Sequence, residues 1–225
     1  IMLSITTAFI LKKWFIRLGK FDVINHRSVH KTQATKTGGI TVFLTLFLIT
    51  IYLYITKQEF FDFSLLIPLG IMFIVGVYDD FYNADFKLKF LLQIVVAKIL
   101  IDQGFVIEHF HGILGLQEIP RITSQIFTVF VFLVIVNAIN FIDGIDGMAI
   151  TEVIKVILLI EFYSTIHTPV YSLGILVVLS CLPLFYLNFK KENKVFLGDA
   201  GSLLLGTLIA IYLFHVLGSD YTFKE

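Results

Sequence analysis

A chain of 225 residues in which only 15% are charged cannot cover a water-facing surface in the usual way, because soluble domains carry about 25% charged residues. Basic and acidic residues are equal in number, so the net charge is zero and basicity gives no argument for nucleic-acid binding. We therefore expect no nucleic-acid partner. With 57% hydrophobic residues and a mean hydropathy of +0.90, the composition predicts an integral membrane protein.

Eight apolar segments follow one another along the chain, at residues 1–11, 37–56, 63–78, 90–107, 122–142, 148–160, 162–189 and 200–219. The fourth contains Lys98 and Asp102, and the sixth contains Glu152 and Lys155; the other six lack Lys, Arg, Asp and Glu. All are expected to be helical, because a bilayer offers no partner for unsatisfied backbone groups and no segment alternates like a barrel strand. The sequence predicts an all-α, polytopic membrane protein of about eight transmembrane helices, with one domain over residues 1–225.

The basic residues fall mainly on one side of this arrangement. Only Lys57, Arg121 and Lys224 lie in loops on the opposite side. The preferred side holds Lys12, Lys13, Arg17, Lys20, Arg27, Lys31, Lys36, Lys87, Lys89, Lys190, Lys191 and Lys194. Because basic residues favour the cytoplasm, this side is predicted to be cytoplasmic. Polar clusters at 26–39, 79–89, 137–147 and 188–202 all fall there, which suggests one shared site.

An aspartate pair, Asp79 and Asp80, directly follows the third apolar segment. On the residues alone, it is either a solvated loop at a helix end or part of a functional site. Adjacent carboxylates at a membrane boundary repel each other, and they become favourable where a divalent cation or a protonated ligand shares them.

Residues 137–147 give the strongest signal. If the segment is helical, Asn137, Asn140 and Asp143 repeat every three residues, and Asp146 continues the series until the glycines break it. These side chains are therefore expected on one face at the inner end of the fifth segment. Two carboxylates with no nearby base favour a functional site over a polar helix-packing face.

Two glycine-containing stretches are suited to phosphate. Asp199, between Gly198 and Gly201, opens the last segment, where it either caps the helix or faces a phosphate at the helix N-terminus. In the first loop, basic residues precede Gly38 and Gly39, so the loop is either a cytoplasmic anchor or a diphosphate site. Carboxylates suited to Mg²⁺ beside such loops imply chemistry on phosphorylated substrates, one of them a lipid.

Together the four motifs resemble those of the polyprenyl-phosphate N-acetylhexosamine-1-phosphate transferases, which include the initiating enzymes of teichoic acid and O-antigen synthesis. The likeness covers essentially the whole chain, and residues 137–147 agree with the family motif at every fixed position. Asp79-Asp80 with Lys89 and Gln93 looks like the family's aspartate-pair motif, and residues 195–202 with Gly206 are similar to its last motif. The first-loop motif is kept at Asp22, Asn25, Arg27, His30, Gly38, Gly39 and Ile40, while Ile24, Gln33 and Thr35 replace its prolines.

This resemblance implies a reaction in which a UDP-sugar and polyprenyl phosphate give polyprenyl-diphospho-sugar and UMP. The motifs are most similar to the N-acetylglucosamine-1-phosphate branch of the family, so the expected donor is UDP-N-acetylglucosamine. It implies a bacterial inner-membrane enzyme with a cytoplasmic site, and it leaves a homodimer open. Asp199 would bind Mg²⁺, with Mn²⁺ as an alternative. Catalytic roles would fall to Asp79, as base or nucleophile, and to Asp80, Asp143 and Asp146. The residues expected to bind substrate are Arg27, His30, Gly38, Gly39, Lys89, Asn137, Asn140, Asn188, Gly198 and Ser202.

The chain departs from the family in one respect. Family members have further helices and a histidine-rich cytoplasmic loop, whereas the six histidines here, His26, His30, His109, His111, His167 and His215, form no such cluster. The first apolar run is also shorter than the roughly 20 residues of a spanning helix. We therefore expect a fragment truncated at both ends. The alternatives are a non-catalytic relative that binds lipid or a partner, and a transporter built on the charges inside the fourth and sixth segments.

Overall fold

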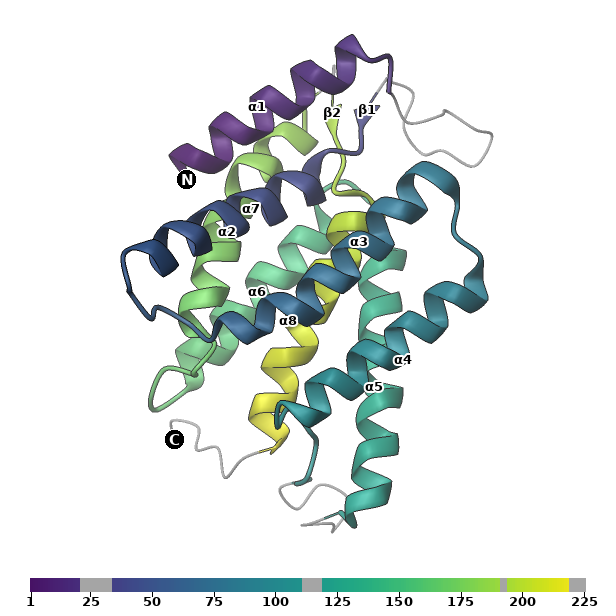
Figure 1. Ribbon diagram of the computed structural model, residues 1–225, viewed down its shortest axis with the longest axis vertical. Coiled ribbons are helices and arrows are strands. Elements are labelled where there is room, and N and C mark those ends of the chain that lie inside the picture. Colours follow the sequence, from purple (N-terminus) through teal and green to yellow (C-terminus); the bar gives the residue numbers. More distant parts are fainter. Residues whose placement is uncertain (21–33, 111–118, 191–193, 219–225) are drawn as a thin grey trace.

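The computed structural model describes residues 1–20, 34–110, 119–190 and 194–218. In these residues, eight α-helices make up nearly all of the regular structure, as Figure 1 shows, which confirms the all-α prediction. A 3₁₀ turn, η1 (Phe63–Leu65), precedes the third helix. The helices are α1 (Met2–Arg17), α2 (Gly38–Ile55), α3 (Leu66–Tyr82), α4 (Phe86–Asp102), α5 (Arg121–Ile142), α6 (Met148–Tyr163), α7 (Tyr171–Asn188) and α8 (Gly198–Gly218).

Five stretches are long and apolar enough to cross a membrane: α2, η1 with α3, α5, α7 and α8. The chain is therefore a multi-pass membrane protein in contact with lipid. Helices α1, α4 and α6 have 16 or 17 residues. Within α4 an ion pair joins Lys98 to Asp102, and within α6 another joins Lys155 to Glu152. Both pairs follow the helical spacing that the sequence predicted.

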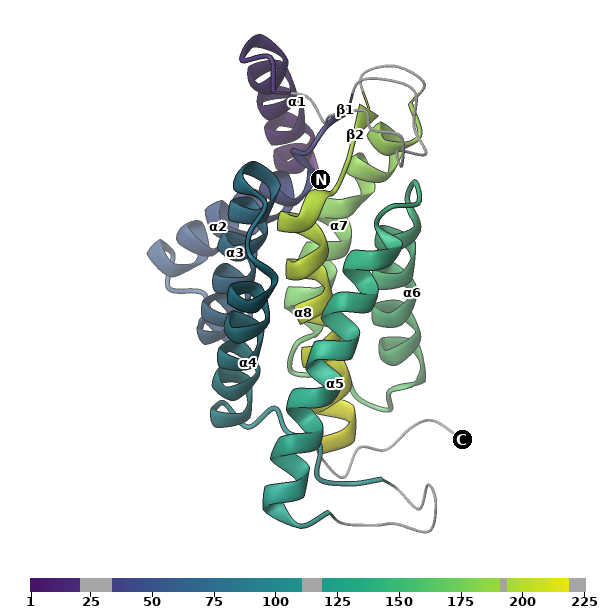
Figure 2. The same ribbon diagram turned by 90° about the vertical axis from the view of Figure 1, so that its right-hand side faces the viewer.

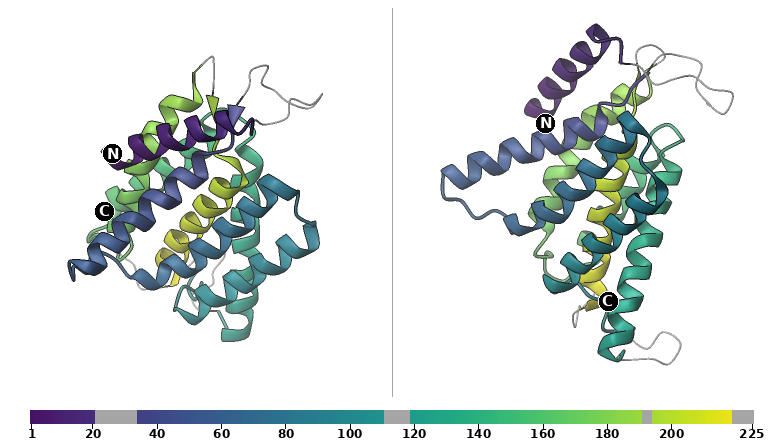
Figure 3. Two further views of the ribbon diagram at one scale, coloured as in Figure 1. Left: turned by 45° about the horizontal axis from the view of Figure 1, so that its top comes forward. Right: turned by 45° about the vertical axis from the view of Figure 1, so that its right-hand side comes forward.

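Helix α8 runs through the middle of the molecule, where α2, α3, α5 and α6 pack around it (Figures 1 and 2). Of its apolar window 83% is buried, against 22% for α5, so α8 is the core of the bundle. Helix α1 packs on α2 and α7 at the edge (Figure 3). The apolar face of every helix is thereby directed either at α8 and its neighbours or at lipid.

Three glycines let neighbouring helices approach α8 closely. A Cβ on Gly39 of α2 would lie 2.1 Å from the backbone nitrogen of Gly201, and one on Gly76 of α3 would lie 2.3 Å from the carbonyl oxygen of Asp199. A Cβ on Gly206 would lie 2.9 Å from the Cα of Val136 in α5. Because no side chain fits at these contacts, α2, α3 and α5 hold the first part of α8 by backbone packing.

A short parallel strand pair joins the loop before α2 to the loop before α8. β1 (Ala34–Thr35) pairs with β2 (Lys194–Val195). The first two amides of α2 then donate to the carbonyl oxygens of Phe196 and Leu197 at 2.9 and 2.8 Å. These bonds occupy amides that a helix start leaves without intrahelical partners. They also bring the starts of α2 and α8 together at one end of the molecule (Figure 2).

Several helix boundaries differ from the predicted segments, and two of them bear on the aspartate pair. Helix α3 does not end at residue 78 but continues through Asp79 and Asp80 to Tyr82, and it ends at Asn83, which has a positive φ of 52°. Helix α4 starts at Phe86 instead of residue 90. The aspartate pair therefore lies on the last turn of a helix, which fixes the two side chains in different directions.

Candidate active site

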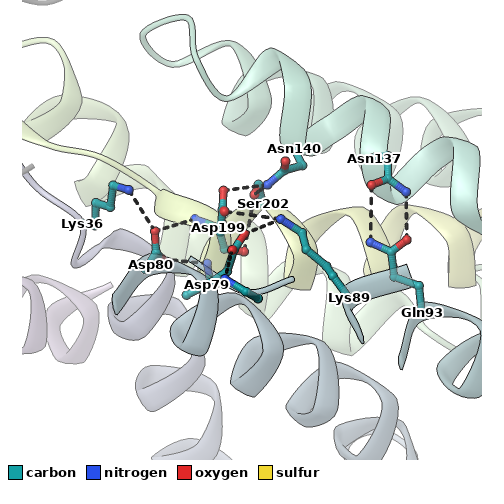
Figure 4. Close-up of polar contacts among 11 residues, drawn as sticks. Lys36, Asp79, Asp80, Lys89, Gln93, Asn137, Asn140, Asp199 and Ser202 are labelled. Atoms are coloured by element: carbon teal, nitrogen blue, oxygen red, sulfur yellow. Dashed lines mark hydrogen bonds and ion pairs between the residues drawn. The ribbon is translucent and has the colours of Figure 1, made fainter. Parts of the chain in front are cut away.

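The first turn of α8 places Asp199 between side chains from α4 and α5 (Figure 4). From α5, Asn140 donates one hydrogen bond to Asp199 Oδ1 and one to Ser202 Oγ, both at 2.8 Å. From α4, Lys89 Nζ lies 3.5 Å from Asp199 Oδ2. Two neighbouring helices thus hold the two oxygens of one carboxylate, whose side chain is still 34% exposed.

Lys89 also forms an ion pair with Asp79 of α3, and both side chains are largely buried. The second oxygen of Asp79 accepts the backbone N–H of Ala84 at 2.8 Å. Because Lys89 contacts Asp79 and Asp199 together, one cation offsets the repulsion between two carboxylates from different helices. A phosphate that entered here would meet the same ammonium group.

Asp80 points away from Lys89, toward the backbone at the start of α8. Its two carboxylate oxygens accept the N–H groups of Asp199 and Ala200 at 3.1 and 3.0 Å, and Lys36 Nζ lies 3.4 Å away. Its side chain is only 5% exposed. Asp80 therefore performs, from another helix, the task of an N-cap residue at the positive end of α8. A Cβ on Gly198 would lie 2.7 Å from this carboxylate, so only glycine fits there.

An open pocket of about 590 Å³ lies against Asp199. Its charged lining consists of the carboxylates of Asp143, Asp146 and Asp199 and the ammonium groups of Lys36 and Lys194. Its size is typical of small-molecule sites. The mixture of lysines and carboxylates suits a phosphorylated ligand that arrives with a divalent cation.

Asp143 caps the C-terminal end of α5 and accepts the backbone N–H of Gly198. Burial, followed by the negative charges of Asp199 and Asp80, raises the pKa of Asp143 to about 7. A carboxyl group with this pKa is poised between its neutral and charged forms at neutral pH. A cation bound nearby would favour the charged form.

Mg²⁺ fits the pocket carboxylates. Among the residues that the structure describes, no three Asp, Glu, His or Cys side chains are grouped closely enough to form a metal cage. Mg²⁺ does not require one, because it keeps several waters and is usually held by one or two carboxylates together with substrate phosphates. Asp199 and Asp143 both line the pocket and are suited to this role.

Residues 62–216 match the family model described as glycosyl transferase family 4. The chain belongs to this family. The matched range contains the aspartate pair, the 137–147 motif and the start of α8, and it leaves out α1, β1 and α2.

Three relatives of this glycosyl transferase family 4 chain are all named as polyprenyl-phosphate N-acetylglucosamine phosphotransferases. One is the Bacillus subtilis (strain 168) "Probable undecaprenyl-phosphate N-acetylglucosaminyl 1-phosphate transferase", 28% identical over 90% of this chain and 57% of the relative. An undecaprenyl-phosphate alpha-N-acetylglucosaminyl 1-phosphate transferase of Pasteurella multocida (strain Pm70) is 30% identical over 91% and 59%. A decaprenyl-phosphate N-acetylglucosaminephosphotransferase of Mycobacterium tuberculosis (strain CDC 1551 / Oshkosh) is 27% identical over 86% and 53%. The chain thus spans somewhat more than half the length of these relatives.

The remaining predicted residues of this family 4 site lie at different places in the structure. Asp143 is the C-cap of α5, in a helical conformation, and its N–H donates to the carbonyl oxygen of Ile139 at 3.2 Å, so it continues the polar face as predicted. Asp146 lies beyond the end of the helix; it also lines the pocket, where it forms an ion pair with Lys194. The glycines after Ile142 redirect the chain, and Gly147, with a φ of 70°, precedes α6.

Other predicted residues lie around the pocket or outside the described part of the chain. Asn188 is buried and donates to the carbonyl oxygen of Val195 at 3.0 Å, so it supports β2. Asn137 does not line the pocket; it pairs with Gln93 of α4. Gly38 and Gly39 serve the backbone contacts at the start of α2. Arg27 and His30 lie outside the described residues.

Two lysines line the pocket that were not among the predicted site residues. Lys36 belongs to the basic loop for which the sequence left open a cytoplasmic anchor or a diphosphate site, whereas Lys194 was expected only as a positive charge before the last helix. Both precede a glycine-containing helix start by a few residues. This shared position is the signal that could have marked them, because the strand pair places the two helix starts side by side.

Proposed function

We propose that this chain carries the active site of a transferase that moves N-acetylglucosamine-1-phosphate from a UDP-sugar to a polyprenyl phosphate. The products are polyprenyl-diphospho-N-acetylglucosamine and UMP, and the step begins a cell-envelope glycan. Family membership and the printed names of the three relatives support this reaction class. Because the chain spans only part of those relatives, the activity is proposed for the protein to which this sequence belongs.

The arrangement around Asp199 carries the proposal. This carboxylate lies at the pocket, is held by Asn140 and Lys89, and has Asp143 as a neighbour. Asp199 and Asp143 would hold Mg²⁺, whose chemistry when bound is to neutralise a diphosphate and the charge that develops in phosphoryl transfer. Lys36 and Lys194, which line the same pocket, would bind the donor phosphates.

The lipid phosphate would arrive at Lys89. Lys89 is already paired with Asp79, so an incoming phosphate would compete for the ammonium group and release Asp79. Asp79 could then remove the proton from the lipid phosphate, whose oxygen attacks the β-phosphorus of the UDP-sugar as the bond to UMP breaks. In the second route, Asp79 attacks that phosphorus first, and the lipid phosphate then takes the sugar-phosphate from the aspartate.

The site is proposed to face the cytoplasm of a bacterial cell, at the inner membrane. The basic residues of the loops at this end of the bundle support that orientation. A cytoplasmic site would also meet the nucleotide sugar where such donors are soluble, while the lipid acceptor stays in the bilayer.

Lipid-dependent UMP release tests the proposal. Membranes containing the chain would be given UDP-N-acetylglucosamine, Mg²⁺ and undecaprenyl phosphate, with Asp199→Asn as the inactive variant and Asp102→Asn, at the far end of α4, as the matched control. UMP release that requires the lipid and is lost only in Asp199→Asn is the expected result. If the folded chain released no UMP, the whole protein to which this sequence belongs would be tested next; no release from any UDP-sugar there would favour a non-catalytic relative that binds lipid or a partner.

Omitting the lipid distinguishes the two routes for Asp79. If Asp79 is the nucleophile, one UMP per protein is released without acceptor, and the chain gains the mass of a sugar-phosphate. If Asp79 is a base, no UMP appears until the lipid phosphate is added. An Asp79→Asn variant that still formed the covalent adduct would exclude Asp79 as the nucleophile.

A further inference from the structure

Gln93 of α4 and Asn137 of α5 form a reciprocal amide pair (Figure 4). Asn137 Nδ2 donates to Gln93 Oε1 at 2.8 Å, and Gln93 Nε2 donates to Asn137 Oδ1 at 3.4 Å. The second hydrogen of Asn137 Nδ2 goes to the carbonyl oxygen of Leu133, one turn back in its own helix, at 2.7 Å. Gln93 is 1% exposed. The pair is therefore a partly buried contact between two helices, and neither of its side chains lines the pocket.

The pair lies one helical turn deeper than the candidate site. Gln93 follows Lys89 by four residues on α4, and Asn137 precedes Asn140 by three residues on α5. Residues at these spacings share a helix face. Helix α4 runs away from the site and α5 runs toward it, so both amides lie on the same side of the two site residues.

Lys89 and Asn140 are the two residues that hold opposite oxygens of Asp199. The orientation of that carboxylate consequently depends on the separation of α4 and α5. Helix α5 is fixed against α8 by the close approach of Val136 to Gly206. At this level, among the described residues, the side-chain hydrogen bonds that join α4 to α5 are those of the amide pair. A reciprocal pair is satisfied only over a narrow range of interhelical distance, because hydrogen bonds weaken steeply when lengthened or bent.

We propose that Gln93 is a positioning residue, which acts with Asn137 as an interhelical clamp that sets Lys89 and Asn140 on either side of Asp199. This inference rests on the proposed function, and it gives Asn137 a clamping role in place of the substrate contact expected from the sequence. Leaving either amide unpaired in an apolar interior is unfavourable. A substitution of either residue therefore leaves the other amide unpaired, so the effects of substitutions at the two positions should depend on each other.

Steady-state kinetics on Gln93→Leu test the clamp. Turnover is expected to fall about 10-fold to 100-fold, because small displacements of catalytic groups have effects of this size. The KM for the UDP-sugar should stay within about twofold, because the lost contact orients the site and does not bind donor. The exchange variant Gln93→Asn with Asn137→Gln restores a pair of the same combined length, and it should recover turnover to within about threefold of wild type.

Gln103→Leu is the matched control. Gln103 ends the same helix, and its side chain donates to the carbonyl oxygen of Ser64 at 3.3 Å, far from the site. It should leave turnover unchanged. In a Lys89→Met background, adding Gln93→Leu should have much less effect than in wild type, because its action passes largely through Lys89.

Each contrary outcome is distinguishable. Unchanged turnover in Gln93→Leu, with an active wild type, would overturn the clamp and leave the proposed function standing. Equal losses in the Gln93 and Gln103 variants, or a loss that the exchange variant does not reverse, would reduce Gln93 to a residue needed only for folding. Inactivity of the unsubstituted whole protein would overturn the proposed function and, with it, any role of Gln93 in catalysis.

Discussion

The molecule contains two kinds of aspartate–lysine pair, and their difference separates site from scaffold. Lys89 contacts Asp79 of α3 and Asp199 of α8, and its side chain is 16% exposed. Lys98 pairs with Asp102 one turn away in α4, and these side chains are 56% and 63% exposed. A pair within one helix forms whenever that helix forms and contributes little. A buried pair between helices exists only when the bundle is assembled, so it marks residues whose placement the fold determines.

This comparison also bears on the transporter alternative, which rested on the charges inside α4 and α6. In each of these helices, the two charged side chains form an ion pair with each other. The carboxylates that come together across helices are the ones at the pocket end. Function is therefore better sought at that end than in the middle of the bundle.

Lys89→Met is expected to have the largest effect on turnover. Removing this ammonium leaves Asp79 and Asp199 without the cation that they share, and it removes the proposed partner of the lipid phosphate. Turnover should fall by at least about 100-fold, the scale typical for loss of a preorganised charge in an active site. UMP release measures it. Turnover above about a tenth of wild type would show that the shared contact is not needed for the reaction.

Gly76→Ala should cause the largest loss of stability. Its Cβ would lie 2.3 Å from a backbone oxygen at the start of α8, whereas a Cβ on Gly70 of the same helix would meet only the Phe43 ring at 3.6 Å. Overpacking of this kind destabilises by about 1–3 kcal/mol or more. Gly70→Ala should be neutral or slightly stabilising, because alanine favours helix. Thermal unfolding of both variants in detergent checks the contrast, and equal midpoints would contradict the close approach of α3 to α8.

Asp80→Asn should weaken the start of α8. The amide keeps one acceptor oxygen, but it loses the negative charge and turns an N–H₂ group toward a backbone donor. The expected loss is about 1–2 kcal/mol of unfolding free energy. Asp62→Asn is the control, because Asp62 accepts from Ser64 at an exposed turn where asparagine caps equally well. Similar losses in the two variants would show that Asp80 has no special role at α8.

The pH dependence of stability should carry the signature of Asp143. Its pKa is raised from 3.8 to about 7, so the folded state binds this proton more tightly than the unfolded state. Stability is therefore expected to fall as pH rises through this interval and to level off above it. Unfolding would be followed across pH in a chelator, with Asp143→Asn as the reference. An identical slope in that variant would assign the effect to another group.

Lys98→Met should have the smallest effect. The pair that it removes is exposed and internal to α4, so the change in unfolding free energy should stay below about 0.5 kcal/mol, with normal turnover. The same unfolding and UMP assays measure it. A loss of turnover near that of Lys89→Met would erase the distinction between the two kinds of pair.

The sequence predicted the helices well because uncharged runs have few alternatives in a bilayer. Its errors arose where polar residues lie at helix ends: α3 continues through Asp79 and Asp80, and Asp146 lies beyond the end of α5. The motifs identified residues of the candidate site, but they did not show which of these residues contact one another. Asp80 caps a helix by accepting the N–H of Asp199, 119 positions later in the sequence, and local spacing carries no information on such a contact.

The central place of α8 has a consequence for how the protein is made. In sequence, α8 follows all seven helices that surround or support it, yet it is the most buried of the five candidate spans. The earlier helices must therefore enter the membrane without their core and leave a gap that α8 later fills. Until α8 arrives, Lys89 and Asn140 have no Asp199 to hold. A chain interrupted during insertion would thus carry most of the membrane segments and none of the assembled site.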